Sequence, residues 1–192
     1  MKFIKSLLIV ILVSLSLQGC GFVVGAAAGA AAIAVVYDHR NIQNSLKDTD
    51  TANKIVNHIR NTPGLRTESH IEVTAFNHIV LLTGETPKQE WKDLAGEIAT
   101  STPGITKVYN QITIQGPTSS LTRTSDAWIT TKIKGLMLAD DNLKSSTIKV
   151  TTENGAVYLM GLVTEGQADT AVNIARQVSG VQKVVKIFQY KK

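Results

Sequence analysis

The feature that most constrains the fold of this 192-residue chain is an internal repeat. Residues 71–84 return as residues 148–161, about 77 positions later, with their apolar, turn and glycine residues in step. Weaker matches extend the similarity in both directions, which predicts one copy at 48–114 and another at 124–190, joined by a linker over 115–123. A repeat of this size predicts a small folded unit used twice, rather than one large domain.

Within each copy, the pattern of apolar residues switches between helix and strand. Ile129, Ile133 and Leu136 have the spacing of one buried helical face, and Val56 and Ile59 repeat it in the first copy. Two alternating runs follow, and then a second amphipathic helix and a closing strand. The expected fold class is therefore α+β: helix, strand, strand, helix, strand, with a three-stranded sheet and two helices on one of its faces.

Turn residues separate these elements at equivalent points of the two copies. Asn154-Gly155 is a strong hairpin signal because both residues tolerate positive φ, whereas Asn77-His78 is a weaker one. Gly84 and Gly161 close the second strand of their copies. The two copies thus agree in their turns as well as in their apolar positions.

The N-terminus begins with a short basic segment, and an apolar run over residues 7–17 follows it. This run is too short to span a bilayer, which takes about 20 residues, and is typical of a secretory signal peptide, expected at 1–19. The letters LQGC, ending at Cys20, resemble the bacterial lipobox and imply that this cysteine, the only one in the chain, is lipidated. Several acyl chains would anchor the protein firmly, because each buried CH₂ contributes about 0.8 kcal/mol. The alternative is an ordinary secretory signal with an incidental cysteine.

Residues 20–47 are expected to form a tether between the lipidated cysteine and the first copy. Residues 21–36 are rich in glycine, alanine and valine. Gly21, directly after the cysteine, points to the outer membrane by the lipoprotein sorting pattern that this segment resembles. The same stretch holds Gly25 and Gly29 in a small-xxx-small arrangement, so a helix-dimerisation face is the alternative.

The repeated helix, hairpin, helix and strand, with a glycine closing the second strand, resembles the BON domain. Two such copies behind a lipobox resemble the dual-BON outer-membrane lipoproteins of the DolP type. The resemblance covers the whole chain and is closest in the second copy, at residues 125–133 and 149–165. It implies a non-enzymatic protein that supports outer-membrane integrity, with enrichment at division sites. It also implies binding of anionic phospholipid, such as phosphatidylglycerol or cardiolipin, through the first helix of the second BON domain.

The sequence contains no recognisable catalytic, metal or cofactor motif. His39, His58, His70 and His78 are scattered, and a single cysteine cannot build a thiolate zinc site. Residues 140–142 are Asp-Asp-Asn but lack the glycine and the terminal glutamate of a calcium loop. Aromatic residues make up only 5% of the chain and the net charge is only +5, which argues against nucleic-acid binding. We therefore expect no enzymatic activity, cofactor or nucleic-acid partner.

The two copies differ at one informative position. The repeat aligns Trp128 with Thr51, so packing of the shared core does not explain the indole. On a helical wheel of about 100° per residue, Trp128 lies beside the buried face with a lysine and small residues. This arrangement suits a membrane interface, where the ring lies at headgroup depth and the ammonium group meets a phosphate, and packing of Trp128 against the first copy is the alternative. The residues of this predicted patch are Trp128, Lys132, Gly135 and Ala139 on the flank, and Lys134 and Leu138 on the remaining polar side.

By the family resemblance, Trp128 and Lys132 match residues of the lipid-binding helix. The first hypothesis is therefore a lipid-anchored envelope protein whose second copy binds anionic phospholipid, while acyl chains on Cys20 hold it near the outer membrane. The second is a protein-interaction accessory of the outer-membrane assembly machinery, with Trp128 as a binding hot spot. Lipid binding would depend on the anionic lipid fraction and weaken with added salt, whereas a protein interface would persist with neutral vesicles when the partner protein is present.

Overall fold

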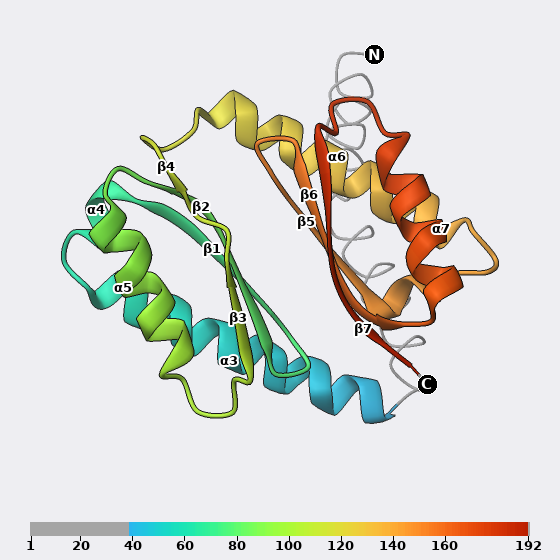
Figure 1. The fold of residues 1–192 in the computed structure, drawn as a ribbon, viewed down its shortest axis with the longest axis horizontal. Coiled ribbons are helices and arrows are strands. Elements are labelled where there is room, and N and C mark those ends of the chain that lie inside the picture. The colour runs from blue at the N-terminus through green and yellow to red at the C-terminus, as the bar shows by residue number, and fades with distance from the viewer. Residues whose placement is uncertain (1–38, 192) are drawn as a thin grey trace, which may run out of the picture. The chain divides into compact units, whose positions relative to one another are not determined.

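The computed structural model describes residues 39–191 (Figure 1). The predicted signal peptide, the lipidated Cys20 and the glycine-rich part of the tether lie outside the described residues. Residues Lys47–Lys192, which include both copies, form one compact unit. Among the described helices, none is long and apolar enough to cross a bilayer.

The first copy consists of a mixed sheet with helices on one face (Figure 1). Its elements are α3 (His39–Asn61), α4 (Leu65–Glu68), β1 (His70–Phe76), β2 (Ile79–Thr86), α5 (Gln89–Thr100), β3 (Lys107–Asn110) and β4 (Thr113–Ile114). Strand β2 lies at the centre of the sheet, antiparallel to β1 and parallel to β3, and β4 also pairs with β2. One apolar core, with Ile55 and Ile59 of α3 and Ile98 of α5, joins both helices to the sheet.

The second copy repeats this arrangement. Its elements are α6 (Ser120–Leu138), the short 3₁₀ helix η1 (Ser145–Thr147), β5 (Ile148–Glu153), β6 (Ala156–Val163), α7 (Glu165–Arg176) and β7 (Lys183–Tyr190). Strand β6 is central, antiparallel to β5 and parallel to β7. Ile129 and Ile133 of α6 share a core with Ala171 and Val172 of α7. The predicted helix, strand, strand, helix and strand of each copy is confirmed.

Both first helices begin earlier than the apolar pattern alone predicts. Helix α3 begins at His39, within the expected tether, and α6 begins at Ser120, within the expected linker. Ser119 explains the second start, because its hydroxyl accepts a hydrogen bond from the backbone N–H of Thr122 at 3.2 Å and so caps the helix.

The hairpins of both copies turn through two residues with positive φ. Asn154 and Gly155 have φ of 50° and 70°, and Asn77 and His78 have φ of 43° and 68°. These values are typical of the type I′ turn, whose twist matches that of the strands on either side. The weaker sequence signal in the first copy therefore forms the same turn as the stronger one.

Each central strand contains, near its end rather than after it, a glycine that is required by close contact between backbones. A Cβ atom on Gly84 would lie 2.0 Å from the carbonyl oxygen of His70, and Gly84 also has a φ of 107°. A Cβ atom on Gly161 would lie 2.6 Å from the carbonyl oxygen of Thr147. Any side chain at these positions would push β1 or β5 away from its partner strand.

The closing strands of the two copies differ. In the second copy β7 runs without interruption from Lys183 to Tyr190. In the first copy the strand breaks between β3 and β4, where the side chain of Asn110 donates to the backbone oxygen of Lys92 at 2.8 Å and accepts from the backbone N–H of Ile112 at 3.3 Å. The break turns Ile112 fully into the core of the first copy.

The sheet faces that carry no helices meet in a third apolar cluster, here called the seam. Its buried residues come from both copies: Ile79, Leu81, Tyr158, Met160 and Ile187. Polar bonds cross the same contact, because the hydroxyls of Thr74 and Thr151 are 3.1 Å apart and Lys149 Nζ donates to the backbone oxygen of Ala75 at 2.7 Å. The two copies are therefore packed sheet against sheet.

Candidate functional site

Helix α6 carries the predicted patch, and its inner side is fixed to the hairpin of its own copy. The carboxylate of Asp126 is buried and accepts hydrogen bonds from the backbone N–H groups of Asn154 and Gly155, both at 2.9 Å. Thr130 donates to Thr152 at 2.7 Å one turn later. These bonds set which side of α6 faces inward, and therefore which side chains face solvent.

The buried face of α6 is made by Ile129, Ile133 and Met137. Leu136 was predicted to complete this face, and that prediction is wrong: its side chain is 39% exposed, whereas Met137 is only 1% exposed. Asp126 explains the difference, because its bonds to the hairpin rotate the inner face toward the row that contains residues 126, 129, 133 and 137. Leu136 consequently lies at the border of the outer face.

The outer face of α6 combines large apolar side chains with lysines. Trp128 is 54% exposed, and Leu138 is more exposed still. Lys132 and Lys134 are exposed, and within residues 39–191 no ion pair engages either ammonium group. Exposed apolar residues next to unpaired cations are typical of a surface that meets a partner with an apolar part and a negative part.

Two open depressions flank this outer face. The first, of about 380 Å³, is lined by Trp128, Thr131, Lys132, Gly135 and Leu136, all from α6 itself. The first copy contributes no lining residue, and half of the indole meets solvent, so the first copy does not cover Trp128. A Cβ atom on Gly135 would contact nothing within 4 Å, so the surface at this glycine is open.

The second depression, of about 290 Å³, receives the other part of the predicted patch. Lys134 and Leu138 line it together with Ser145 and Ser146 of η1. The structure therefore divides the predicted residues between two neighbouring surfaces, while Ala139 lies exposed at the end of the helix in neither. Burial lowers the pKa of Lys149 on β5. The charge of Asp48 raises this pKa, and the charge of Lys134 lowers it further. This end of α6 therefore lies close to a second cation.

Sequence reasoning missed Leu121, which is strongly exposed on the same helix. It was assigned to the linker because the cap at Ser119 was not recognised. Leu121 precedes Trp128 by two helical turns, so the two side chains project from the same side of α6. A helix start at the Ser-Ser pair would have revealed it.

Helix α3 of the first copy is the counterpart of α6 and lacks the patch. Asp48 of α3 accepts a hydrogen bond from the backbone N–H of Asn77 at 2.9 Å, as Asp126 does from the hairpin of the second copy. This correspondence aligns Trp128 with Asp50, so the predicted alignment with Thr51 is wrong by one residue. Asp50 forms an ion pair with Lys54 at 2.6 Å, and Lys54 is the counterpart of Lys132. Where the first copy has a neutralised pair, the second has an indole beside an ammonium group that forms no ion pair in the part of the chain that the structure describes.

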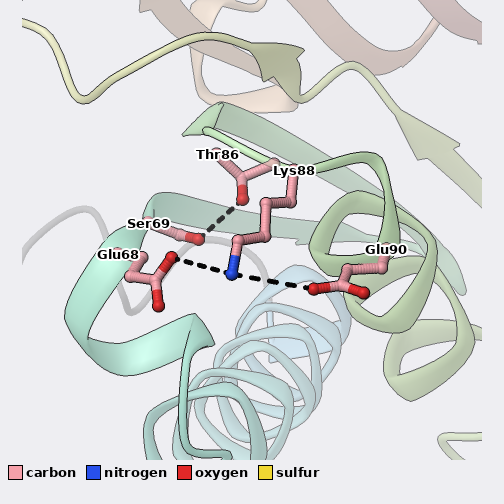
Figure 2. Close-up of polar contacts among 5 residues, drawn as sticks. All are labelled: Glu68, Ser69, Thr86, Lys88 and Glu90. Atoms are coloured by element: carbon pink, nitrogen blue, oxygen red, sulfur yellow. Dashed lines mark hydrogen bonds and ion pairs between the residues drawn. The ribbon is translucent and has the colours of Figure 1, made fainter.

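The other tryptophan of the chain is held quite differently. Trp91 of α5 is partly buried against the core of the first copy, and a Cβ atom on Gly64 would overlap its ring. Lys88 lies with its Nζ 5.2 Å from the ring centroid and is itself paired with Glu68 at 3.4 Å and Glu90 at 3.8 Å (Figure 2). The Trp91 ring is thus packed and covered, unlike that of Trp128.

Comparison with known proteins agrees with this architecture. Residues 47–116 and 125–192 each match the family model described as BON domain. The outer membrane lipoprotein DolP of Haemophilus influenzae is 35% identical over 188 residues, which cover 97% of this chain and 96% of that protein. A 21 kDa hemolysin of Actinobacillus pleuropneumoniae is 35% identical over 153 residues, covering 80% of this chain and 79% of its own.

Another relative matches a smaller share of the chain. Osmotically-inducible protein Y of Escherichia coli is 32% identical over 117 residues, which cover 59% of this chain and 58% of that protein. Together, these similarities support an outer-membrane lipoprotein of the cell envelope rather than an enzyme. The chain belongs to the BON domain family as a dual-BON protein of the DolP type.

Proposed function

We propose that this protein is anchored in the outer membrane through acyl chains on Cys20, on the periplasmic side, and binds anionic phospholipid through the outer face of α6. Its role would be to support outer-membrane integrity, with enrichment at the division site. The observation that carries the proposal is the half-exposed Trp128 beside Lys132, which no ion pair engages within the described residues, at positions where the first copy has the Asp50–Lys54 ion pair.

The chemistry of the face fits a lipid headgroup region. An indole is apolar over most of its surface and carries one N–H donor, so it favours the boundary between acyl chains and water. Lys132 and Lys134 would meet phosphate oxygens, and each cation close to an anionic membrane contributes about 1 kcal/mol. Leu121 and Leu138 would add apolar contact near the two ends of the helix.

The anchor makes even weak headgroup binding effective. Acyl chains on Cys20 would keep the BON domains at a high local concentration near the bilayer, so that α6 binds in an essentially intramolecular step. Phosphatidylglycerol and cardiolipin are the anionic lipids we expect it to bind. A dedicated lipid pocket is not required, since the open depressions beside Trp128 and Lys134 admit headgroups from the surface.

The test is co-sedimentation with vesicles, using the protein without its leader and with Cys20→Ala, so that acyl chains do not mask the contribution of α6. Trp128→Glu removes an apolar contact worth about 1.5–3 kcal/mol and adds a repelled charge worth about 1 kcal/mol, so affinity for vesicles containing phosphatidylglycerol should fall roughly a hundredfold. Tyr190→Glu is the matched control, because Tyr190 is an aromatic residue of the same domain with a similar exposed fraction, 50%.

The control should bind as the parent protein does, and binding of both should weaken with added salt. Equal binding of the parent to phosphatidylcholine vesicles, or undiminished binding of Trp128→Glu, would contradict lipid recognition by α6. If the parent ignores all vesicles but Trp128→Glu abolishes capture of an outer-membrane assembly component, the protein-interaction hypothesis is the correct one.

A further inference from the structure

Two carboxyl groups, one from each BON domain, meet beside the seam. Glu85 near the end of β2 is completely buried, and Glu153 at the end of β5 is nearly so. The side chain of Asn154, the residue after Glu153, lies 2.8 Å from the Glu85 carboxylate, so the two carboxyl groups lie close together. Two buried carboxylates cannot both be ionised at such close range without strong repulsion, so the contact requires a proton.

Glu85 is surrounded by hydrogen-bond donors. One of its oxygens accepts a hydrogen bond from the Asn154 side chain at 2.8 Å, across the domain boundary. The other accepts from the backbone N–H of Thr118 at 3.3 Å and from the Thr118 hydroxyl at 3.4 Å. Since hydrogen bonds to a carboxylate stabilise its charge, the proton belongs on Glu153, whose O–H then donates to Glu85.

Charges on the neighbouring elements reinforce this assignment. Burial, the charge of Glu85 and the hydrogen bond to it, and then Glu72 on β1 and Asp126 on α6, raise the pKa of Glu153 to about 8. Burial, and then the charge of Glu153, raises the pKa of Tyr158 on β6. The other titratable groups nearby are His70 on β1 and Arg123 on α6, which line the same open depression of about 310 Å³ as Glu153.

We propose that Glu85 and Glu153 form a proton-dependent latch between the two BON domains: it is closed while the pair shares one proton and loosens when both carboxyls are ionised. The latch joins the domains directly, because it links β2 of one sheet to β5 of the other beside the Asn154 bond. The depression next to Glu153 gives solvent protons access to it.

The direction of the pH effect follows from the change in proton affinity. Separation of the domains would remove Glu85 and Glu72 from Glu153 and let water reach it, so its pKa would fall from about 8 toward the ordinary value of 4.5. At pH values between these two pKa values, the closed state therefore binds one more proton than the open state. Its advantage is complete below about pH 4.5, declines as the pH rises and is lost above about pH 8. Opening should consequently become easier in mildly alkaline medium.

The experiment uses the full-length protein in detergent micelles with labelled glutamate side chains and labelled methyl groups. Carbon-13 shifts of the Glu153 carboxyl report its titration directly and need no variant. A soluble paramagnetic compound reports whether the seam methyls of Leu81, Met160 and Ile187 become accessible. The methyls of Ile98 and Val172, buried inside the separate cores, are the internal reference.

We expect the opening equilibrium constant of the parent protein to rise more than roughly tenfold between about pH 6 and about pH 9. This rise should follow the loss of the proton from Glu153. Glu153→Gln keeps an N–H donor for Glu85 but cannot ionise, so its seam methyls should stay protected throughout. Glu97→Gln, an exposed glutamate on α5, should behave as the parent does. Because both variants keep Lys149, a difference between them cannot come from the titration of that lysine.

Seam methyls that remain protected in the parent protein up to about pH 9 would overturn the latch. So would a carboxyl of Glu153 that titrates near its ordinary value, or a seam that opens equally in Glu153→Gln. If Glu153→Gln does not fold, the carbon-13 titration and the methyl accessibility of the parent protein still decide between these outcomes.

Discussion

Helices α3 and α6 begin their BON domains in the same way and differ most on the side that faces solvent. Each places an aspartate, Asp48 or Asp126, on the backbone of its hairpin turn and buries isoleucines against the sheet. On the outer side, Asp50 and Lys54 of α3 neutralise one another, whereas Lys132, beside Trp128, has no ion-pair partner among residues 39–191. The comparison teaches that the fold specifies the inner half of this helix and leaves the outer half free to acquire a function.

The inner halves should respond alike to loss of packing. Ile55 and Ile133 are both fully buried at equivalent places, so Ile55→Ala and Ile133→Ala should each lower the free energy of unfolding by about 2–5 kcal/mol. Denaturant titration followed by circular dichroism measures this change. Because the seam joins the domains, we expect both variants to shift the same transition. Two separate transitions would show that the domains unfold independently.

The aspartates should differ in a predictable order. Asp126 accepts from two backbone N–H groups of its turn, whereas the bond from Asn77 is the one that the structure gives for Asp48 within the described residues. Asp126→Ala should therefore cost about 2–3 kcal/mol of unfolding free energy, and Asp48→Ala about 1–2 kcal/mol. Equal losses, measured by the same denaturant titration, would contradict the view that the second helix is held more tightly to its hairpin.

The smallest effect is the most direct test of the outer halves. Asp50→Trp removes the partner of Lys54 and gives α3 the indole and free ammonium group of α6. In the background of Trp128→Glu, this change should restore about 1–2 kcal/mol of binding to vesicles that contain phosphatidylglycerol, or roughly tenfold in affinity. Asp50→Ala, which frees Lys54 without adding a ring, is the control. A graft that binds no better than this control would show that more than the Trp–Lys pair is needed.

Much of this fold was predictable because its sequence pattern occurs twice in the chain. Periodicity located the strands and helices, and Asn154-Gly155 identified a turn whose weaker counterpart, Asn77-His78, has the same geometry. The exposed indole was also predictable, since Trp128 has no apolar counterpart in the first copy. These features depend on residues that are close in sequence, where spacing alone carries the information.

The remainder depends on contacts between residues that are distant in sequence. The bonds from the hairpins to Asp48 and Asp126 shift the alignment of the two first helices by one residue. As a result, Met137 rather than Leu136 lies in the core, and Asp50 rather than Thr51 is the counterpart of Trp128. The pairing of Glu85 with Glu153 depends on how the two sheets pack, which no repeat pattern contains.

Asp126 has a consequence for how such a domain can change over generations. Because the helix is held from within, substitutions on its outward residues alter neither its position nor its length. A tandem gene duplication can therefore give rise to two copies that keep one fold and diverge through surface changes alone.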